Sequence, residues 1–225
     1  WTINNKLSVS AGIRYSIFNA FGPASVNEYT PGLPRDTSSV SGISTYASGK
    51  IIKTWQAPEI RIGLRYSLGN NNSVKLSYNS MQQYIHMLSN TVTISPTDIW
   101  KLSDRFVQPQ QGQQVSIGYY HDFKNNTIEA SVEGYYKRIK HFLDYKSGAS
   151  LLMNEHIETD LINTRGKAWG VEFLLKKTAG RLNGWFSYTY SRTFLQQDDP
   201  IAGEKINRGE WYPASFDKPH NVNAI

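Results

Sequence analysis

Apolar and polar residues alternate one by one over several stretches of the chain. Between residues 6 and 17, Val9, Ile13 and Ile17 fall on one face of an extended chain, and Ser10 and Arg14 fall on the other. Side chains of a strand point alternately to its two faces, so this period of two predicts β-strands with one apolar and one polar face. We expect seven such strands and a short eighth at the C-terminus; the seven alternating stretches are residues 6–17, 59–68, 74–79, 115–123, 128–136, 169–175 and 182–191.

The connections between these strands come in two sizes that tend to alternate along the chain. Tight turns rich in Asn and Gly, residues that tolerate positive φ, are expected at residues 70–72, 124–126 and 178–181. Long segments lie at residues 18–50, 88–111, 147–158 and 197–217. Short turns on one side of a sheet and long loops on the other are typical of bacterial outer-membrane barrels, whose turns lie in the periplasm.

Together the two patterns predict an all-β fold, an antiparallel meander of about eight strands that forms part of a larger transmembrane β-barrel. Residues 1–225 form a single partial barrel domain in this interpretation. A passive porin-type channel and a soluble β-sandwich, acting as a carbohydrate-binding module, stay open as alternatives, because a sandwich alternates in the same way. The barrel is favoured because the polar faces suit a water-filled lumen, and because Tyr, Trp and Phe gather toward strand ends, as in interfacial girdles.

The composition removes several other classes of protein. No stretch approaches the ~20 consecutive apolar residues of a membrane-spanning helix, which excludes a helical membrane protein. The formal net charge is +6, but the bases are dispersed along the chain, so we do not expect nucleic-acid binding. The absence of cysteine excludes disulfides and thiol catalysis. Residues 1–6 lack the features of a signal peptide, so we expect either a removed leader or an internal fragment.

Several short runs occur in an order that brings a known family to mind. They are residues 78–86 (YNSMQQYIH), 95–100 (SPTDIW), 132–137 (VEGYYK), 170–177 (GVEFLLKK) and 216–221 (FDKPHN). Together they resemble the barrel domain of TonB-dependent outer-membrane receptors, from about Glu59 to the C-terminus. The resemblance implies a barrel of about 22 strands, closed by an N-terminal plug domain. It also implies import of bulky nutrients, such as siderophores, cobalamin, glycans or peptides, with energy from the inner-membrane TonB complex.

The chain departs from that family in what it lacks. It has no plug, no TonB-contacting segment, and only about eight of the strands, so we expect a fragment from the C-terminal half of the barrel of a parent chain. Energised uptake then belongs to the parent chain in the cell outer membrane. The expected partners are the plug domain of the parent chain, the TonB complex through that chain, and a surface lipoprotein, as for some family members.

The sequence offers no catalytic residue and no cofactor or metal site, so we do not expect an enzyme. The five histidines lack the spacing of zinc ligands and are expected to face solvent or the lumen; they are His86, His121, His141, His156 and His220. Glu129, Glu133 and Glu172 fall on polar faces. We interpret these acids as a charged wall that faces a plug or the arginines Arg14, Arg61 and Arg65.

Ligand contacts are expected from aromatic residues of the long loops and the upper lumen, where rings stack on sugars or flat chelates. The candidates are Trp55, Trp100, Trp211 and Tyr212. Two other interpretations stay open at this point. These aromatic side chains also suit the anchoring of one loop against another, and Trp211-Tyr212-Pro213 also suits an anchor at the membrane interface.

Overall fold

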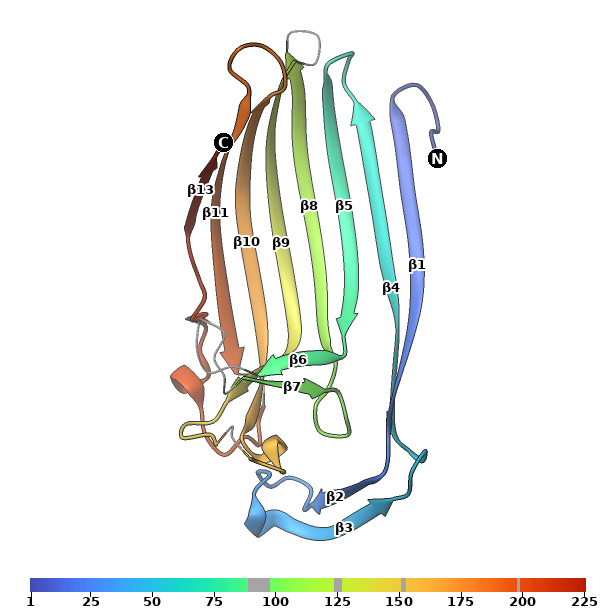
Figure 1. The fold of residues 1–225 in the computed structure, drawn as a ribbon, viewed down its shortest axis with the longest axis vertical. Helices are drawn as coiled ribbons and strands as arrows, with labels where there is room; N and C mark the ends of the chain where they lie inside the picture. The colour runs from blue at the N-terminus through green and yellow to red at the C-terminus, as the bar shows by residue number, and fades with distance from the viewer. Residues whose placement is uncertain (89–97, 124–126, 151–152, 198) are drawn as a thin grey trace.

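The computed structural model shows an open antiparallel sheet of long strands, with two short hairpins at one end (Figure 1). The structure describes residues 1–88, 98–123, 127–150, 153–197 and 199–225. The main sheet consists of β1 (Leu7–Phe21), β4 (Ile51–Ser67), β5 (Asn72–Gln83), β8 (Gln110–Phe123), β9 (Ile128–Tyr145), β10 (Leu161–Lys177), β11 (Gly184–Gln197), β12 (Tyr212–Pro213) and β13 (His220–Ala224).

Smaller elements lie at the loop end of this sheet. The hairpins are β2 (Ala24–Tyr29) with β3 (Val40–Tyr46) and β6 (Ile85–Leu88) with β7 (Ile99–Leu102). The helical turns are η1 (Thr37–Ser39), η2 (Ile157–Thr159) and η3 (Ile206–Gly209). Within the described ranges, no helix has the length and apolar character needed to cross a membrane.

The strand order confirms the predicted all-β meander. The long strands follow one another across the sheet as β1, β4, β5, β8, β9, β10 and β11, and β12 and β13 both pair with β11 at different heights. Short turns join β4 to β5 and β10 to β11 as predicted, at the end opposite the hairpins (Figure 1). The predicted turn at residues 124–126 lies outside the described residues.

Three segments that the sequence analysis assigns to loops contain strands, so that part of the prediction is wrong; in residues 197–217 the strand is the two-residue β12. In residues 18–50, β1 continues to Phe21, and β2 and β3 pair as a hairpin. In residues 88–111, β7 pairs with β6, and β8 begins at Gln110. These strands are short, or their apolar and polar residues do not alternate regularly. Only their pairing with another segment of the chain reveals them.

The register aligns the alternating residues of all long strands into two continuous faces. One row takes an apolar or aromatic residue from each of eight strands: Leu7, Tyr66, Val74, Tyr119, Val132, Phe173, Tyr188 and Val222. The adjacent row holds small, polar and charged residues: Ser8, Arg65, Lys75, Gly118, Glu133, Glu172, Thr189 and Asn221. We call the first the outer face and the second the inner face.

The outer face is uncovered. Ile117, in the middle of the sheet, is 58% exposed, and no second layer of the described residues packs on its row. The buried apolar residues gather instead at the loop end, in a cluster of Leu88, Val107, Ile157 and Leu161. A soluble β-sandwich buries the apolar faces of its sheets against each other, and this sheet does not.

Pro58 ends the pairing between β4 and β5. The backbone N–H of Ile60 points toward β5 and donates to the Ser80 hydroxyl over 2.8 Å. Pro58, two residues earlier, has the same orientation but no N–H, so it offers β5 no donor. Beyond this point β4 pairs with β1 alone, and the resulting two-stranded ribbon leads to the β2–β3 hairpin (Figure 1).

Candidate functional site

The segment between β5 and β8 folds over the inner face near the loop end. Tyr84 stacks on Phe18 with ring centroids 5.1 Å apart, and its hydroxyl lies 2.6 Å from the Ser16 hydroxyl. The Trp55 indole N–H donates to the carbonyl oxygen of Asp104 over 2.8 Å. The contacted residues Ser16, Phe18 and Trp55 occupy inner-face positions of β1 and β4. This segment therefore lies across the inner face at the loop end of the sheet.

Within that segment, the β6–β7 hairpin buries side chains against neighbouring loops. Leu88 is 2% exposed and packs in one cluster with Val107, Ile157 and Leu161. His86 is 4% exposed, and its Nε2 lies 3.1 Å from the Ser103 hydroxyl. Burial lowers the pKa of His86, partly offset by the Asp104 carboxylate. The expectation that this histidine faces solvent or the lumen is therefore wrong, because a tertiary contact of the loops buries it.

Charged and aromatic contacts tie the β2–β3 hairpin to the same layer. The Arg105 guanidinium donates two hydrogen bonds to the Glu28 carboxylate, at 2.5 and 2.6 Å. The Tyr29 hydroxyl donates to Glu158 over 3.0 Å, and burial raises the pKa of Tyr29 to about 12. The ring of Phe106 contacts Tyr29 edge-on, at a centroid distance of 5.3 Å. Segments far apart in the sequence thus form one connected structure, which we call the loop layer (residues 18–50, 84–88, 98–109 and 146–160).

A cavity of about 620 Å³ opens in the loop layer. Its walls come from the end of β1, from β2, from β7 and the residues that follow it, and from residues 155–158. The apolar part includes Phe18, Phe21, Val26, Trp100 and Leu102. The charged part includes Lys101, Arg105, Glu155, His156 and Glu158. The aromatic rings in this cavity can stack on a flat or sugar-like ligand, and the charged side chains can form hydrogen bonds with its polar groups.

The four aromatic residues predicted as ligand contacts are not all placed together. Trp100 lines the cavity and is 67% exposed. Trp55 is not among the residues that line the cavity, but its indole N–H donates to the carbonyl oxygen of Asp104, which does line it. Trp211 instead contacts the Lys167 ammonium group, 4.1 Å from its ring, and the Tyr212 hydroxyl donates to Asp144 over 2.9 Å. Of the four candidates, Trp100 thus belongs to the loop layer, and Trp55 on β4 is hydrogen-bonded to it.

Several cavity residues were missed by sequence reasoning. Arg105 and His156 reach the cavity through loops whose course the alternation pattern does not predict. The β2–β3 hairpin carried a weak signal, because Val26 and Ile43 fall in short stretches of β-branched and polar residues on either side of Pro31-Gly32. No comparable signal marks residues 155–158.

The inner face divides its charges between two regions. Arg65 and Lys75 lie opposite each other on β4 and β5, whereas Glu133 and Glu172 lie opposite each other on β9 and β10. Arg14 pairs with Glu59, an acid that is 2% exposed and that the sequence analysis did not include in the charged wall. The described residues hold no group of three His, Asp or Glu side chains placed to bind a metal ion.

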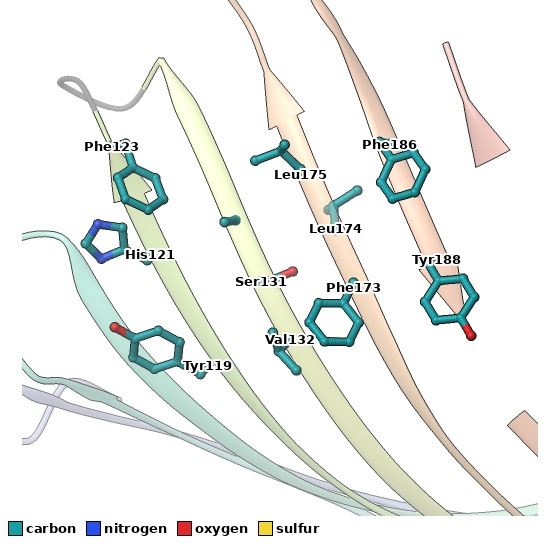
Figure 2. A pocket seen from close by; sticks show the side chains of 11 residues that line it. Tyr119, His121, Phe123, Ser131, Val132, Phe173, Leu174, Leu175, Phe186 and Tyr188 are labelled. Atoms are coloured by element: carbon teal, nitrogen blue, oxygen red, sulfur yellow. The ribbon is translucent and has the colours of Figure 1, made fainter. Parts of the chain in front are cut away.

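The outer face carries an apolar hollow of about 670 Å³ near the turn end (Figure 2). Figure 2 shows Phe123, Phe173, Phe186 and Tyr188 standing around it, on strands β8, β10 and β11. Almost all of the lining atoms are apolar. Such a surface is costly in water and suits contact with hydrocarbon chains.

The comparisons with known proteins agree with this two-faced sheet. A family model described as "TonB dependent receptor-like, beta-barrel" matches residues 1–224. Comparison with curated proteins and with solved structures gave no match. The family comprises receptors and transporters of the Gram-negative outer membrane and is not a family of enzymes. The outer face of the sheet therefore contacts lipid, and the inner face lines the lumen. The chain belongs to the TonB-dependent receptor-like β-barrel family.

Proposed function

We propose that the chain is the part of a receptor barrel that helps to capture a bulky nutrient at the cell surface for energised uptake. The candidate ligand classes are siderophores, cobalamin, glycans and peptides. Residues 1–225 act in this proposal as one partial barrel domain of a parent chain. That chain supplies the plug domain, which meets the inner face, and the contact with the TonB complex.

The cavity in the loop layer is the observation that carries the proposal. Long loops of outer-membrane barrels face the outside of the cell, so the cavity lies where a ligand arrives. Its volume of about 620 Å³ falls within the range of small-molecule sites, which is roughly 300–1,000 Å³. The exposed Trp100 supplies a stacking surface, and Lys101 and His156 supply polar contacts beside it.

A surface lipoprotein is a further partner in this proposal. The β2–β3 hairpin lies farthest from the turn end of the sheet (Figure 1). Its residue Ile43 is 67% exposed, and Leu33 between the two strands is exposed as well. Exposed apolar side chains on an outermost loop are candidate contacts for a protein that covers the barrel.

Ligand binding to the full-length parent receptor tests the proposal. The probes are a ferric siderophore, cobalamin, an oligosaccharide and a peptide, each titrated by calorimetry in detergent. We expect one class to bind and Trp100→Ala to weaken that binding about threefold to tenfold, since an aromatic contact contributes roughly 0.5–1.5 kcal/mol. Trp169→Ala is the matched control, because Trp169 lies on the lipid-facing side.

Two results would contradict the proposal. One is equal binding by the Trp100→Ala and Trp169→Ala receptors, which would place the ligand elsewhere. The other is the absence of binding by all four probes, together with leakage of small solutes from liposomes that contain the full-length protein. That outcome would support the passive channel instead.

A further inference from the structure

Basic residues gather on the outer face of β9, β10 and β11, toward the loop end. We call them the basic band: Arg138, Lys140, Arg165, Lys167 and Arg192. On each strand an aromatic residue occupies the neighbouring outward position on the side of the turns. The pairs of aromatic and basic residues are Tyr136 and Arg138 on β9, Trp169 and Lys167 on β10, and Tyr190 and Arg192 on β11. Lys167 lies opposite Arg138 in the register, so the change occurs at nearly one height on adjacent strands.

The described residues place a carboxylate beside only some of the cations in the band. Arg192 forms an ion pair with Asp217, at 2.8 Å from Nε to Oδ2. For Arg138, Lys140 and Lys167, no carboxylate of the described residues lies within ion-pair distance. Arg138 and Lys140 are exposed, and Lys167 is partly exposed. Three cations on this face thus lack an anionic partner from the described chain.

Aromatic rings hold two of these cations, Arg138 and Lys167, at the edge of the apolar surface. The Lys167 ammonium group lies 4.1 Å from the ring centre of Trp211 and 5.8 Å from that of Phe194. The Arg138 guanidinium lies 5.6 Å from the ring centre of Tyr136. Tyr and Trp favour the depth of lipid headgroups, so cations stacked on them lie at that depth as well.

Because the long loops face the cell exterior, this headgroup layer is that of the outer leaflet. We propose that the basic band binds an anionic lipid of the outer leaflet through phosphate groups in its headgroup. Arg138 and Lys167 lie opposite each other on strands ~5 Å apart, close enough to share one phosphate. Lys140 lies two residues farther along β9, ~7 Å away, where it meets a second phosphate.

Native mass spectrometry of the full-length receptor in detergent tests this lipid site. The probes are diphosphoryl lipid A and its fully dephosphorylated form, added separately and in competition. We expect the wild-type receptor to prefer the phosphorylated lipid. The variant with Arg138→Gln, Lys140→Gln and Lys167→Gln should bind it on the order of a hundredfold more weakly, because each basic residue at a membrane surface contributes about fivefold.

The matched control carries Arg61→Gln, Lys75→Gln and Lys137→Gln, which remove the same charges from the inner face. We expect it to retain the preference for the phosphorylated lipid. An equal loss of binding to the phosphorylated lipid in both variants would show an effect of net charge and would overturn the proposal. A wild-type receptor that does not prefer the phosphorylated lipid over the dephosphorylated one would overturn it as well. Displacement of the lipid by a large molar excess of inorganic phosphate would also overturn it, because the site would then hold a free anion.

Discussion

A charge placed on the outer face should destabilise the barrel far more than a charge on the inner face of the same strand. Ile117 on β8 is 58% exposed, so an arginine at this position has room and costs little if the face meets water. In a bilayer the same arginine costs ~2–4 kcal/mol at the midplane and ~0–1 kcal/mol at the interfaces. The substitution Ile117→Arg therefore separates the two environments.

The depth of Ile117 sets the expected magnitude. The outward positions of β8 run from Phe123 through His121, Tyr119 and Ile117 to Val115, so Tyr119 is at their centre and Ile117 is two residues from it. Two residues advance ~7 Å along a strand and ~5 Å across a membrane when the strand tilts by about 40°. Ile117 thus lies well inside the hydrocarbon layer, and we expect Ile117→Arg to lower the free energy of unfolding by ~2 kcal/mol.

Urea unfolding of the full-length receptor in liposomes measures this difference. Gln114→Arg is the control on the same strand, because Gln114 points to the inner face, and we expect it to change the free energy of unfolding by less than ~1 kcal/mol. Equal losses for Ile117→Arg and Gln114→Arg would refute the assignment of the two faces. A loss caused by Ile117→Arg in detergent but not in liposomes would refute it as well.

Three further predictions concern the loop layer. Leu88→Ala should destabilise this layer by ~2–5 kcal/mol, because Leu88 is 2% exposed and the change leaves a cavity, and faster hydrogen exchange in β6 and β7 would show it. The Arg105 and Glu28 side chains are 37% and 31% exposed, so a double-mutant cycle with Arg105→Gln and Glu28→Gln should give only a weak coupling after solvent screening, much smaller than the effect of Leu88→Ala. Burial lowers the pKa of His86 from 6.5, so the folded hairpin favours the neutral ring. The contribution of the neutral ring to the stability of the hairpin should be fully present above pH 6.5 and decrease as the pH falls below that value. Hydrogen exchange measures this: after correction for intrinsic rates, exchange in β6 and β7 should rise relative to exchange in β8 as the pH falls.

The alternation of residues determined which parts of the chain form the wall and which way each side chain points. Val132 and Glu133 are neighbours in sequence, and the pleat of a strand sends them to opposite faces whatever their partners are. The eight strands and their two faces follow from this local geometry. Asn-rich and Gly-rich turns between adjacent strands are local as well, which is why the meander was predictable.

Contacts between distant segments decided the rest. The extension of β4 to Ile51 depends on its pairing with β1, and the burial of His86 depends on residues that follow β7. Trp100 and Trp211 look alike in the sequence, yet one lines the cavity and the other stacks on Lys167. Their positions result from loop packing, whose free energy arises only when several segments meet, so no local pattern along the chain encodes it.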